Sequence, residues 1–200
     1  MPDVRATTLR LFVAIELPEP VRRALERMVG GLVRAGATEG VRWVRPEGIH
    51  LTLKFLGAVA GERVAGIERA VGEAADAAVA FDLGVGVPGS FGGRRNLRVV
   101  WASVGGDTAA LATLAEGVDE ALAALGFDRE RRAFAAHITL GRVRDDAPPS
   151  LRERLYEAVR QAPPETVPTL RVTSISLMRS TLGAGGAKYD AIATFPLREP

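Results

Sequence analysis

The chain has 200 residues, of which 47% are apolar and 25% charged, so its composition excludes a disordered or membrane-embedded protein. It has no cysteine, which excludes disulfides and thiolate metal sites. All of its 26 basic residues except Lys54 and Lys188 are arginine, although the formal net charge is only +2. Arginine suits bidentate contact with phosphate, but a GC-rich coding sequence would produce the same bias.

The first half of the chain alternates strand and helix patterns. Residues 1–20 have too short an apolar run for a secretory signal and too many charges for a membrane span, so we expect a cytoplasmic protein. Apolar patterning predicts strands over residues 9–17, 41–44, 50–56 and 79–87, and helices over residues 18–34 and 62–78. We expect Gly57 to end the third strand, and residues 88–96 to form a mobile basic loop.

The second half repeats this plan. It predicts strands over residues 98–104, 137–143, 169–178 and 189–197, and helices over residues 108–125 and 150–161. Residues 183–186 (GAGG) suit a hairpin connection better than a phosphate-binding loop, because they do not open a helix. We interpret the chain as a single domain over residues 1–200 with two intertwined lobes. The internal repeat covers about residues 9–88 and 97–178, and a C-terminal strand follows at 189–197.

Both histidines of the chain open the same four-residue pattern. The two copies are His50-Leu51-Thr52-Leu53 and His137-Ile138-Thr139-Leu140. Side chains alternate between the faces of a strand, so each histidine shares a face with the following threonine while the aliphatic residues point into a core. Two lobes related by a pseudo-two-fold axis would bring the motif strands face to face. Their cleft would then hold two imidazoles and two hydroxyls.

These four side chains suit displacement at phosphorus. Imidazole exchanges protons near neutral pH, so one ring can activate a nucleophile while the other protonates a leaving oxygen. The hydroxyls can donate hydrogen bonds to the remaining phosphate oxygens. A catalytic metal would need three or more ligands, and the sequence offers neither an HxxxH pattern nor an obvious carboxylate partner. Purely structural histidines are the alternative, which the matched pair of motifs disfavours.

The motifs and their flanking segments resemble the 2H phosphoesterases, and among them the RNA 2′,3′-cyclic phosphodiesterases, once called 2′-5′ RNA ligases. The resemblance covers nearly the whole chain, through the segments RLFVAIELP, GIHLTLKFLG, RVVWASV, HITLGRV and SLMRSTLGAGGAKYDAIATFPL. One departure is Ala136, which stands where the family often has proline.

The resemblance implies an α+β, bilobal fold in which two pseudo-symmetric lobes of mostly antiparallel sheet face a central cleft. It implies hydrolysis of RNA 2′,3′-cyclic phosphodiester ends to 2′-phosphomonoesters, reversible as 2′-5′ ligation, without a metal or other cofactor. His50 takes the place of the family's proton donor and His137 that of its proton acceptor. Thr52 and Thr139 would hold the phosphate.

Two further residues are candidates for substrate binding. Phe55 stands where an aromatic ring would stack on the terminal base, although simple alternation places it on the core face with Leu51 and Leu53. Arg142 is near enough to its motif to reach the phosphate. Simple alternation places Arg142 on the core face as well, together with Ile138 and Leu140, unless the strand twists or ends at Gly141.

The expected partner is RNA with a 2′,3′-cyclic phosphate end, such as a tRNA fragment, bound by a monomer that makes no membrane contact. The basic residues of 94–98 and 129–132 would guide the RNA backbone, or else are ordinary surface charge. Trp43 and Trp101 are expected in the core or the cleft wall. Two alternatives stay open: a related activity on 2′-5′ linked oligonucleotides or small cyclic nucleotides, and an RNA- or nucleotide-binding module without turnover.

Overall fold

The protein is described by a computed structural model over residues 8–36, 40–183 and 186–199. The strands in these residues are β1 (Thr8–Glu16), β2 (Val41–Trp43), β3 (His50–Ala60), β4 (Phe81–Phe91), β5 (Val99–Gly106), β6 (His137–Val143), β7 (Leu170–Val172), β8 (Ser174–Gly183) and β9 (Gly186–Pro196). The helices are α1 (Glu19–Arg34), α2 (Val64–Ala77), α3 (Thr108–Ala123) and α4 (Pro149–Gln161), with short 3₁₀ helices η1 (Pro46–Gly48) and η2 (Gly61–Arg63). None of these helices is long and apolar enough to cross a membrane.

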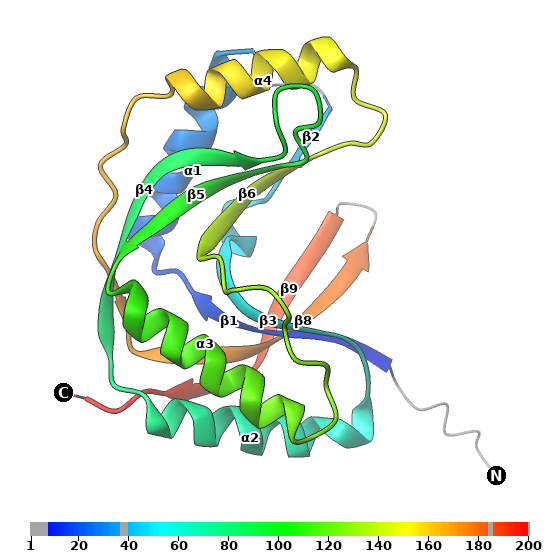
Figure 1. Cartoon of the computed structure of the whole chain (residues 1–200), viewed down its shortest axis with the longest axis vertical. Helices are drawn as coiled ribbons and strands as arrows, with labels where there is room; N and C mark the ends of the chain where they lie inside the picture. Colours follow the sequence, from blue (N-terminus) through cyan, green and yellow to red (C-terminus); the bar gives the residue numbers. More distant parts are fainter. Residues whose placement is uncertain (1–7, 37–39, 184–185, 200) are drawn as a thin grey trace.

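All of these strands join one curled antiparallel sheet with the order β7-β4-β5-β6-β3-β1-β8-β9, and β2 pairs with β6. The sheet curves into a C shape whose two arms are the β4-β5-β6 part and the β3-β1-β8-β9 part (Figure 1). The arms meet where β3 pairs with β6 through Leu51 and Ile138. The motif strands therefore lie side by side in a continuous sheet, instead of face to face as the sequence led us to expect.

The helices cover the outer side of the C. α1 and α4 lie over the β4-β5-β6 arm, whereas α2 and α3 pack against each other and beneath the other arm (Figure 1). α1 belongs to the first half of the chain and α3 to the second, so each arm is covered by helices from both halves. None of the four α-helices lies on the concave side (Figure 1).

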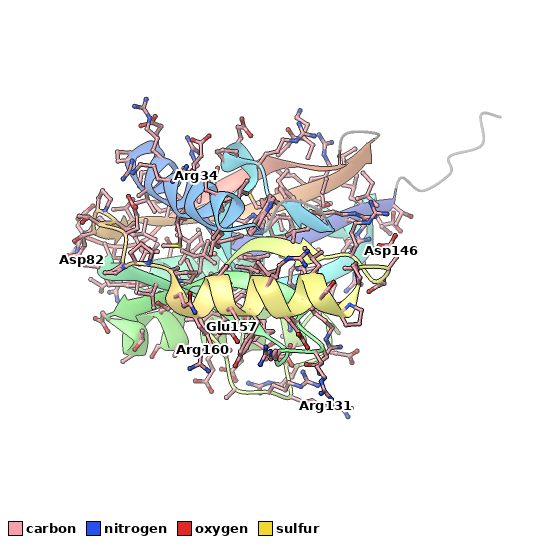
Figure 2. All side chains as sticks on the ribbon, turned by 90° about the horizontal axis from the view of Figure 1, so that it is seen from above. Arg34, Asp82, Arg131, Asp146, Glu157 and Arg160 are labelled. Carbon is pink, nitrogen blue, oxygen red and sulfur yellow. The ribbon has the colours of Figure 1, made fainter. Side chains whose placement is uncertain are left out.

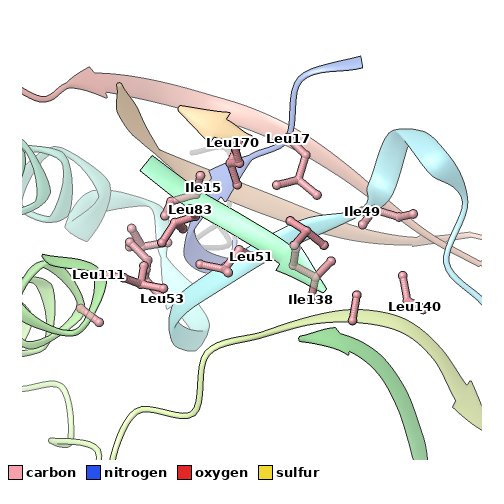
Figure 3. Packing of buried hydrophobic residues seen from close by; sticks show 14 of the residues in the cluster. Ile15, Leu17, Ile49, Leu51, Leu53, Leu83, Leu111, Ile138, Leu140 and Leu170 are labelled. Carbon is pink, nitrogen blue, oxygen red and sulfur yellow. The ribbon is translucent and has the colours of Figure 1, made fainter. Parts of the chain in front are cut away.

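Buried aliphatic side chains from both arms and all four helices form one hydrophobic cluster. Leu51 and Ile138 are fully buried near its centre (Figure 3). Because neighbouring side chains on a strand point to opposite faces, the residues that flank this pair must point to the concave side. The aliphatic half of each motif thus fixes the direction of its polar half.

Most of the predicted helices and strands are present, but three boundaries differ. β3 continues beyond Gly57, which adopts φ +72° at a bulge where Leu56 has no cross-strand partner. β4 continues through Pro88 to Phe91, because another register shift accommodates the proline. Most of the predicted loop 88–96 is therefore strand or turn, and of residues 183–186 the two central ones lie outside the described residues.

The third difference is at residues 169–178, which we expected to form one strand. The segment divides at Thr173 into β7, which pairs with β4, and β8, which pairs with β1. These partners lie in different arms of the sheet. The break at Thr173 therefore carries the chain from one arm to the other.

Candidate active site

The pairing of Leu51 with Ile138 sets the positions of the four motif residues. In an antiparallel pair, one step along each strand brings Thr52 opposite His137 and His50 opposite Thr139, on the face away from Leu51 and Ile138. Opposite residues of such a pair have Cα atoms about 4.5–5.5 Å apart. The two imidazoles and two hydroxyls are thus brought to one patch of the concave face.

Each histidine ring is held by a backbone carbonyl two residues earlier in the chain. Nδ1 of His50 lies 2.8 Å from the carbonyl oxygen of Gly48, and Nδ1 of His137 lies 2.7 Å from that of Ala135. A carbonyl can only accept a hydrogen bond, so both Nδ1 atoms carry the proton. Nε2 of each neutral ring is therefore an unprotonated base, free for proton transfer.

Aromatic rings pack around the two histidines unequally. The Phe12 ring lies 4.7 Å from the His50 ring, and Tyr189 contacts the same imidazole edge-on at 5.0 Å. His137 has one such neighbour, Phe91, with ring centroids 4.8 Å apart. Two ring contacts therefore fix the orientation of the His50 ring more tightly than one contact fixes that of His137.

Burial lowers the pKa of His50 below its ordinary value of 6.5. The carbonyl of Gly48 opposes this change, the charge of Arg142 adds to it, and the charge of Glu16 again opposes it. Without an anion beside it, His50 therefore favours the neutral imidazole. A bound phosphodiester would supply the negative charge that raises this pKa.

Phe55 and Arg142 both lie on the concave face, because each motif strand has a bulge at the fourth position of its motif. β1 pairs Val13 with Lys54 and Ala14 with Thr52, which leaves Leu53 without a partner. β6 likewise leaves Leu140 unpaired in its register with β5. An extra residue reverses the alternation that follows it. Of the two orientations that the sequence left open for Phe55 and Arg142, the structure therefore has the one toward the concave face.

A cavity of about 450 Å³ occupies the concave side. Its walls include three of the four motif residues, the two residues placed by the bulges, and residues of β1, β8, β9 and the segment between β2 and β3. The lining residues are Arg10, Leu11, Phe12, Val44, Gly48, His50, Thr52, Phe55, Gly57, Thr139, Arg142, Ser180, Leu182, Ala187 and Tyr189. His137 is not among its walls, although register places it beside Thr52. Phe55, which is 67% exposed, presents its ring at the surface of this cavity.

The sequence did not identify Tyr189, Ser180 or Leu182 as site residues. They reach the cavity because β8 pairs with β1 and β9 pairs with β8. These contacts join the end of the chain to its beginning, and no local pattern signals them. Arg10 of β1 also lines the cavity.

The other candidate residues are placed differently. Arg94 lies 3.9 Å from Glu153 and 3.8 Å from Glu157, and Arg129 contacts Asp119, so neither basic segment is wholly free for RNA. Trp43 and Trp101 are half-buried, and their indole nitrogens have no hydrogen-bond partner. Within the described residues, no group of three or more acidic or histidine side chains could hold a metal ion.

The sequence profile of the family described as "LigT like Phosphoesterase" matches residues 15–101 and 105–189, which is most of the chain. The chain belongs to this family. The chain is similar to the RNA 2′,3′-cyclic phosphodiesterase of Methanothermobacter thermautotrophicus, with 32% identity over 94% of this chain and 99% of that protein. It is also 32% identical to the enzyme of the same name from Archaeoglobus fulgidus, over 94% and 99% of the two chains.

Solved structures of the LigT-like family have the same fold. The crystal structure of the Thermus thermophilus protein TT0787 matches with a TM-score of 0.75 and 29% identity, over 96% of this chain and 99% of that one. E. coli LigT complexed with 3′-AMP matches with a TM-score of 0.72 and 26% identity, over 96% and 99%. The α+β fold with mostly antiparallel sheet, which the family resemblance implies, is confirmed.

Proposed function

We propose that the protein hydrolyses RNA 2′,3′-cyclic phosphodiester ends to 2′-phosphomonoesters, with His50 as proton donor and His137 as proton acceptor. The observation that carries this proposal is the equivalent arrangement of the two motifs. Register brings each histidine beside the other motif's threonine, and a carbonyl holds each Nδ1 so that Nε2 remains for proton transfer. The names of the family relatives support the same substrate class.

The reaction is a single displacement at phosphorus. Nε2 of His137 takes a proton from water, whose oxygen forms a bond to phosphorus as the bond from phosphorus to the ribose 3′ oxygen breaks. The protonated Nε2 of His50 donates its proton to that leaving oxygen. The product is a 2′-phosphomonoester with a free 3′-hydroxyl, and proton exchange with solvent restores both rings. With the 5′-hydroxyl of another RNA end in place of water, the same displacement would form a 2′-5′ linkage and free the 3′-hydroxyl.

The remaining candidate residues would bind the substrate. The hydroxyls of Thr52 and Thr139 donate hydrogen bonds to the phosphate oxygens that do not leave, and these bonds strengthen as charge develops. Arg142 adds a positive charge at the edge of the same patch. The exposed ring of Phe55 offers a face on which the terminal base stacks.

The proposal is tested by incubating the protein, with EDTA, with an oligonucleotide that ends in a 2′,3′-cyclic phosphate. We expect turnover to a 2′-phosphate end, because imidazole and hydroxyl groups supply the proton transfers and the hydrogen bonds. A 3′-phosphate product would mean that the other ester bond breaks. Loss of turnover in EDTA and its return with zinc or manganese would mean that the histidines act as metal ligands.

The finer features of the proposal have their own measurements. Parallel assays with 2′-5′ linked oligonucleotides, small cyclic nucleotides and tRNA fragments would rank the substrates of this cavity. Ligation is measured with added 5′-hydroxyl RNA. Sedimentation would test the predicted monomer, and the cytoplasmic location stays a prediction.

A further inference from the structure

Two arginines lie directly opposite each other at the edge of the concave face. β2 and β6 pair antiparallel with Arg42 opposite Arg142, and both side chains are exposed. Opposite residues point to the same face of a sheet. The flanking pair Val41 and Val143 packs with the core, so the two arginines point to the concave side. Figure 1 shows β2 running beside β6 in the upper arm.

This arrangement is unfavourable without an anion, because like charges directly opposite each other in a sheet repel. Neither guanidinium has an ion-pair or hydrogen-bond partner within the part of the chain that the structure describes. The carboxylate of Asp146 is near enough for Arg42 to contribute to its lowered pKa. That carboxylate is held by two hydrogen bonds from Arg144, at 2.9 and 2.8 Å.

Two other arginines in the same sheet lie opposite an acidic residue instead of a second arginine. Arg171 of β7 lies opposite Asp82 of β4, and their charged atoms are 3.4 Å apart. Arg179 of β8 lies opposite Asp190 of β9, at 3.5 Å. Each of these arginines is thus compensated by an acidic residue across the strand pair. Arg142 faces a second arginine instead, so the positive charge of this pair is available to an anionic ligand.

The arginine pair lies next to the patch that holds the four motif residues. Arg142 lines the same cavity as His50 and Thr139, and it follows Thr139 on β6 after the bulge. Arg42 lies across from Arg142 on β2, which pairs with the same edge of β6 as β3, and it is not among the residues that line this cavity. Neighbouring strands are about 4.8 Å apart. The two arginines therefore extend positive charge outward from the site proposed for the cyclic phosphate.

We propose that Arg42 and Arg142 form a second phosphate subsite, which binds the phosphodiester joining the terminal nucleotide to the rest of the RNA. This inference rests on the proposed function. A cyclic phosphate occupies the 3′ end of its strand, so the only neighbouring phosphate lies on the 5′ side. The five N–H donors of each arginine allow Arg142 to contact both phosphates while Arg42 contacts only the outer one. The subsite would make an RNA end a better substrate than a cyclic mononucleotide.

The test uses two substrates that differ by one phosphodiester: a nucleoside 2′,3′-cyclic phosphate, and the same compound carrying a methyl phosphodiester on its 5′ oxygen. The measured quantity is the ratio of kcat/KM for the second substrate to that for the first. We expect Arg42→Ala to lower this ratio about tenfold, equivalent to about 1.4 kcal/mol. Arg42→Lys should give an intermediate ratio, because it keeps the charge but loses the bidentate fork.

Arg34→Ala is the matched control, since it removes one exposed arginine from α1, away from the cavity (Figure 2). It should keep the wild-type ratio. An oligonucleotide substrate gives a second measure. Its binding should depend less on salt in Arg42→Ala, with the slope of log K against log [salt] reduced by about 0.7 for the one lost phosphate contact.

The possible failures are distinguishable. An unchanged ratio in Arg42→Ala, beside normal turnover by the wild type, would overturn the second subsite and leave the proposed function intact. An equal decrease in Arg34→Ala would also overturn it, because the effect would then come from net charge. If the wild-type protein hydrolyses neither substrate, the proposed function fails and the subsite fails with it.

Discussion

His50 and His137 have equivalent backbone anchors and different surroundings. Each Nδ1 is held by the carbonyl two residues before it, which leaves the two Nε2 atoms chemically alike. Phe12 and Tyr189 pack against His50, however, and burial lowers its pKa. A ring whose pKa is lowered is the stronger acid once it is protonated, which agrees with its proposed role as the donor to the leaving oxygen.

Replacing either histidine by alanine should lower kcat by about 10²–10⁴-fold, the usual contribution of a general acid or base. Product should still bind, because the proposed phosphate contacts of Thr52, Thr139 and Arg142 remain. A cyclic phosphodiester analogue whose leaving group is a weak base should partly restore His50→Ala and not His137→Ala, since it needs no proton donor. Single-turnover rates with both substrates measure this difference. Restoration of His137→Ala alone would reverse the two roles.

The pH profile should depend on whether substrate is bound. If His50 acts as the acid, its active form is lost as the pH rises through its pKa, which lies below 6.5 in the free enzyme. The alkaline limb of the kcat/KM profile, which reports the free enzyme, should therefore have its midpoint below pH 6.5. The alkaline limb of the kcat profile should have its midpoint at a higher pH, because the bound phosphodiester stabilises the imidazolium. An alkaline limb of kcat/KM above pH 6.5 would contradict this assignment.

Arg142→Gln provides an independent check of the same assignment. The charge of Arg142 lowers the pKa of His50, so its removal should move the alkaline limb of kcat/KM to higher pH. The maximal rate should fall as well, because one phosphate contact is lost. A limb that stays in place would show that the titrating group is not His50.

At the residue scale, the sequence predicted the orientation of the side chains that depend on alternation and left open the orientation of those that depend on bulges. His50 and Thr52 share a face because Leu51 must be buried, and hydrophobic patterning reveals this directly. Phe55 lies beyond the bulge at Leu53, which reverses the alternation. A bulge is defined by the neighbouring strand, so the sequence of β3 alone does not show it.

Lys54 connects the first motif strand to the segment that leads into the second. It is 8% exposed and forms an ion pair with Asp119 of α3, and its Nζ donates to the carbonyl of Asp128 at 2.7 Å. Asp119 also accepts a hydrogen bond from the backbone N–H of Glu130, at 3.1 Å. Burial would raise the pKa of Asp119, but the hydrogen bonds from Lys54 and Glu130 outweigh it and lower the pKa below 3.8.

Lys54→Met should destabilise the protein by about 1.5–3 kcal/mol, the usual contribution of hydrogen bonds to charged groups, because Asp119 then keeps only the more exposed Arg129 as a cation. It should also lower kcat, since the segment that precedes His137 loses an anchor. Urea unfolding and turnover measure the two effects. Lys54→Met combined with Asp119→Leu should recover part of the stability, because no buried charge is then left alone. A loss from Lys54→Met below about 1 kcal/mol, the usual range of a surface ion pair, would mean that the pair is effectively exposed.

The ion pair between Lys54 and Asp119 should make the free energy of unfolding depend on pH in acid. A carboxyl whose folded pKa is depressed stabilises the fold fully above its unfolded pKa, here 3.8, and the stability is lost as the pH falls through the lower folded value. The difference in unfolding free energy between the wild type and Asp119→Asn should therefore shrink as the pH falls below 3.8. A difference that is constant down to about pH 2 would contradict this linkage.

Element boundaries were predictable where local signals mark them. α1 begins after Pro18, and α3 begins after the N-cap residue Asp107, whose side chain accepts a hydrogen bond from the N–H of Ala110. The division of residues 169–178 at Thr173 has no such signal. It results from β7 and β8 pairing with different strands, β4 and β1, which are brought near only by the complete fold.

At the scale of the whole molecule, the two arms of the sheet depend on each other. Helices from both halves of the chain cover each arm, and a single hydrophobic cluster includes residues of both arms. The β3–β6 contact at Leu51 and Ile138 lies inside this cluster. Neither half of the chain therefore carries a core of its own, even though the two halves resemble each other in sequence plan. The internal repeat itself stays a prediction.

The protein should consequently unfold in one cooperative transition instead of arm by arm. Both tryptophans belong to the β2-β4-β5-β6 arm, since Trp43 lies in β2 and Trp101 in β5, so their fluorescence reports that arm alone. Far-ultraviolet circular dichroism reports the helices and strands of both arms. The two signals should give the same midpoint and the same slope in a urea titration, because loss of either arm removes helices that cover the other. A fluorescence midpoint that differs from the dichroism midpoint would show that the arms unfold separately, and that the Leu51–Ile138 contact joins two independent units.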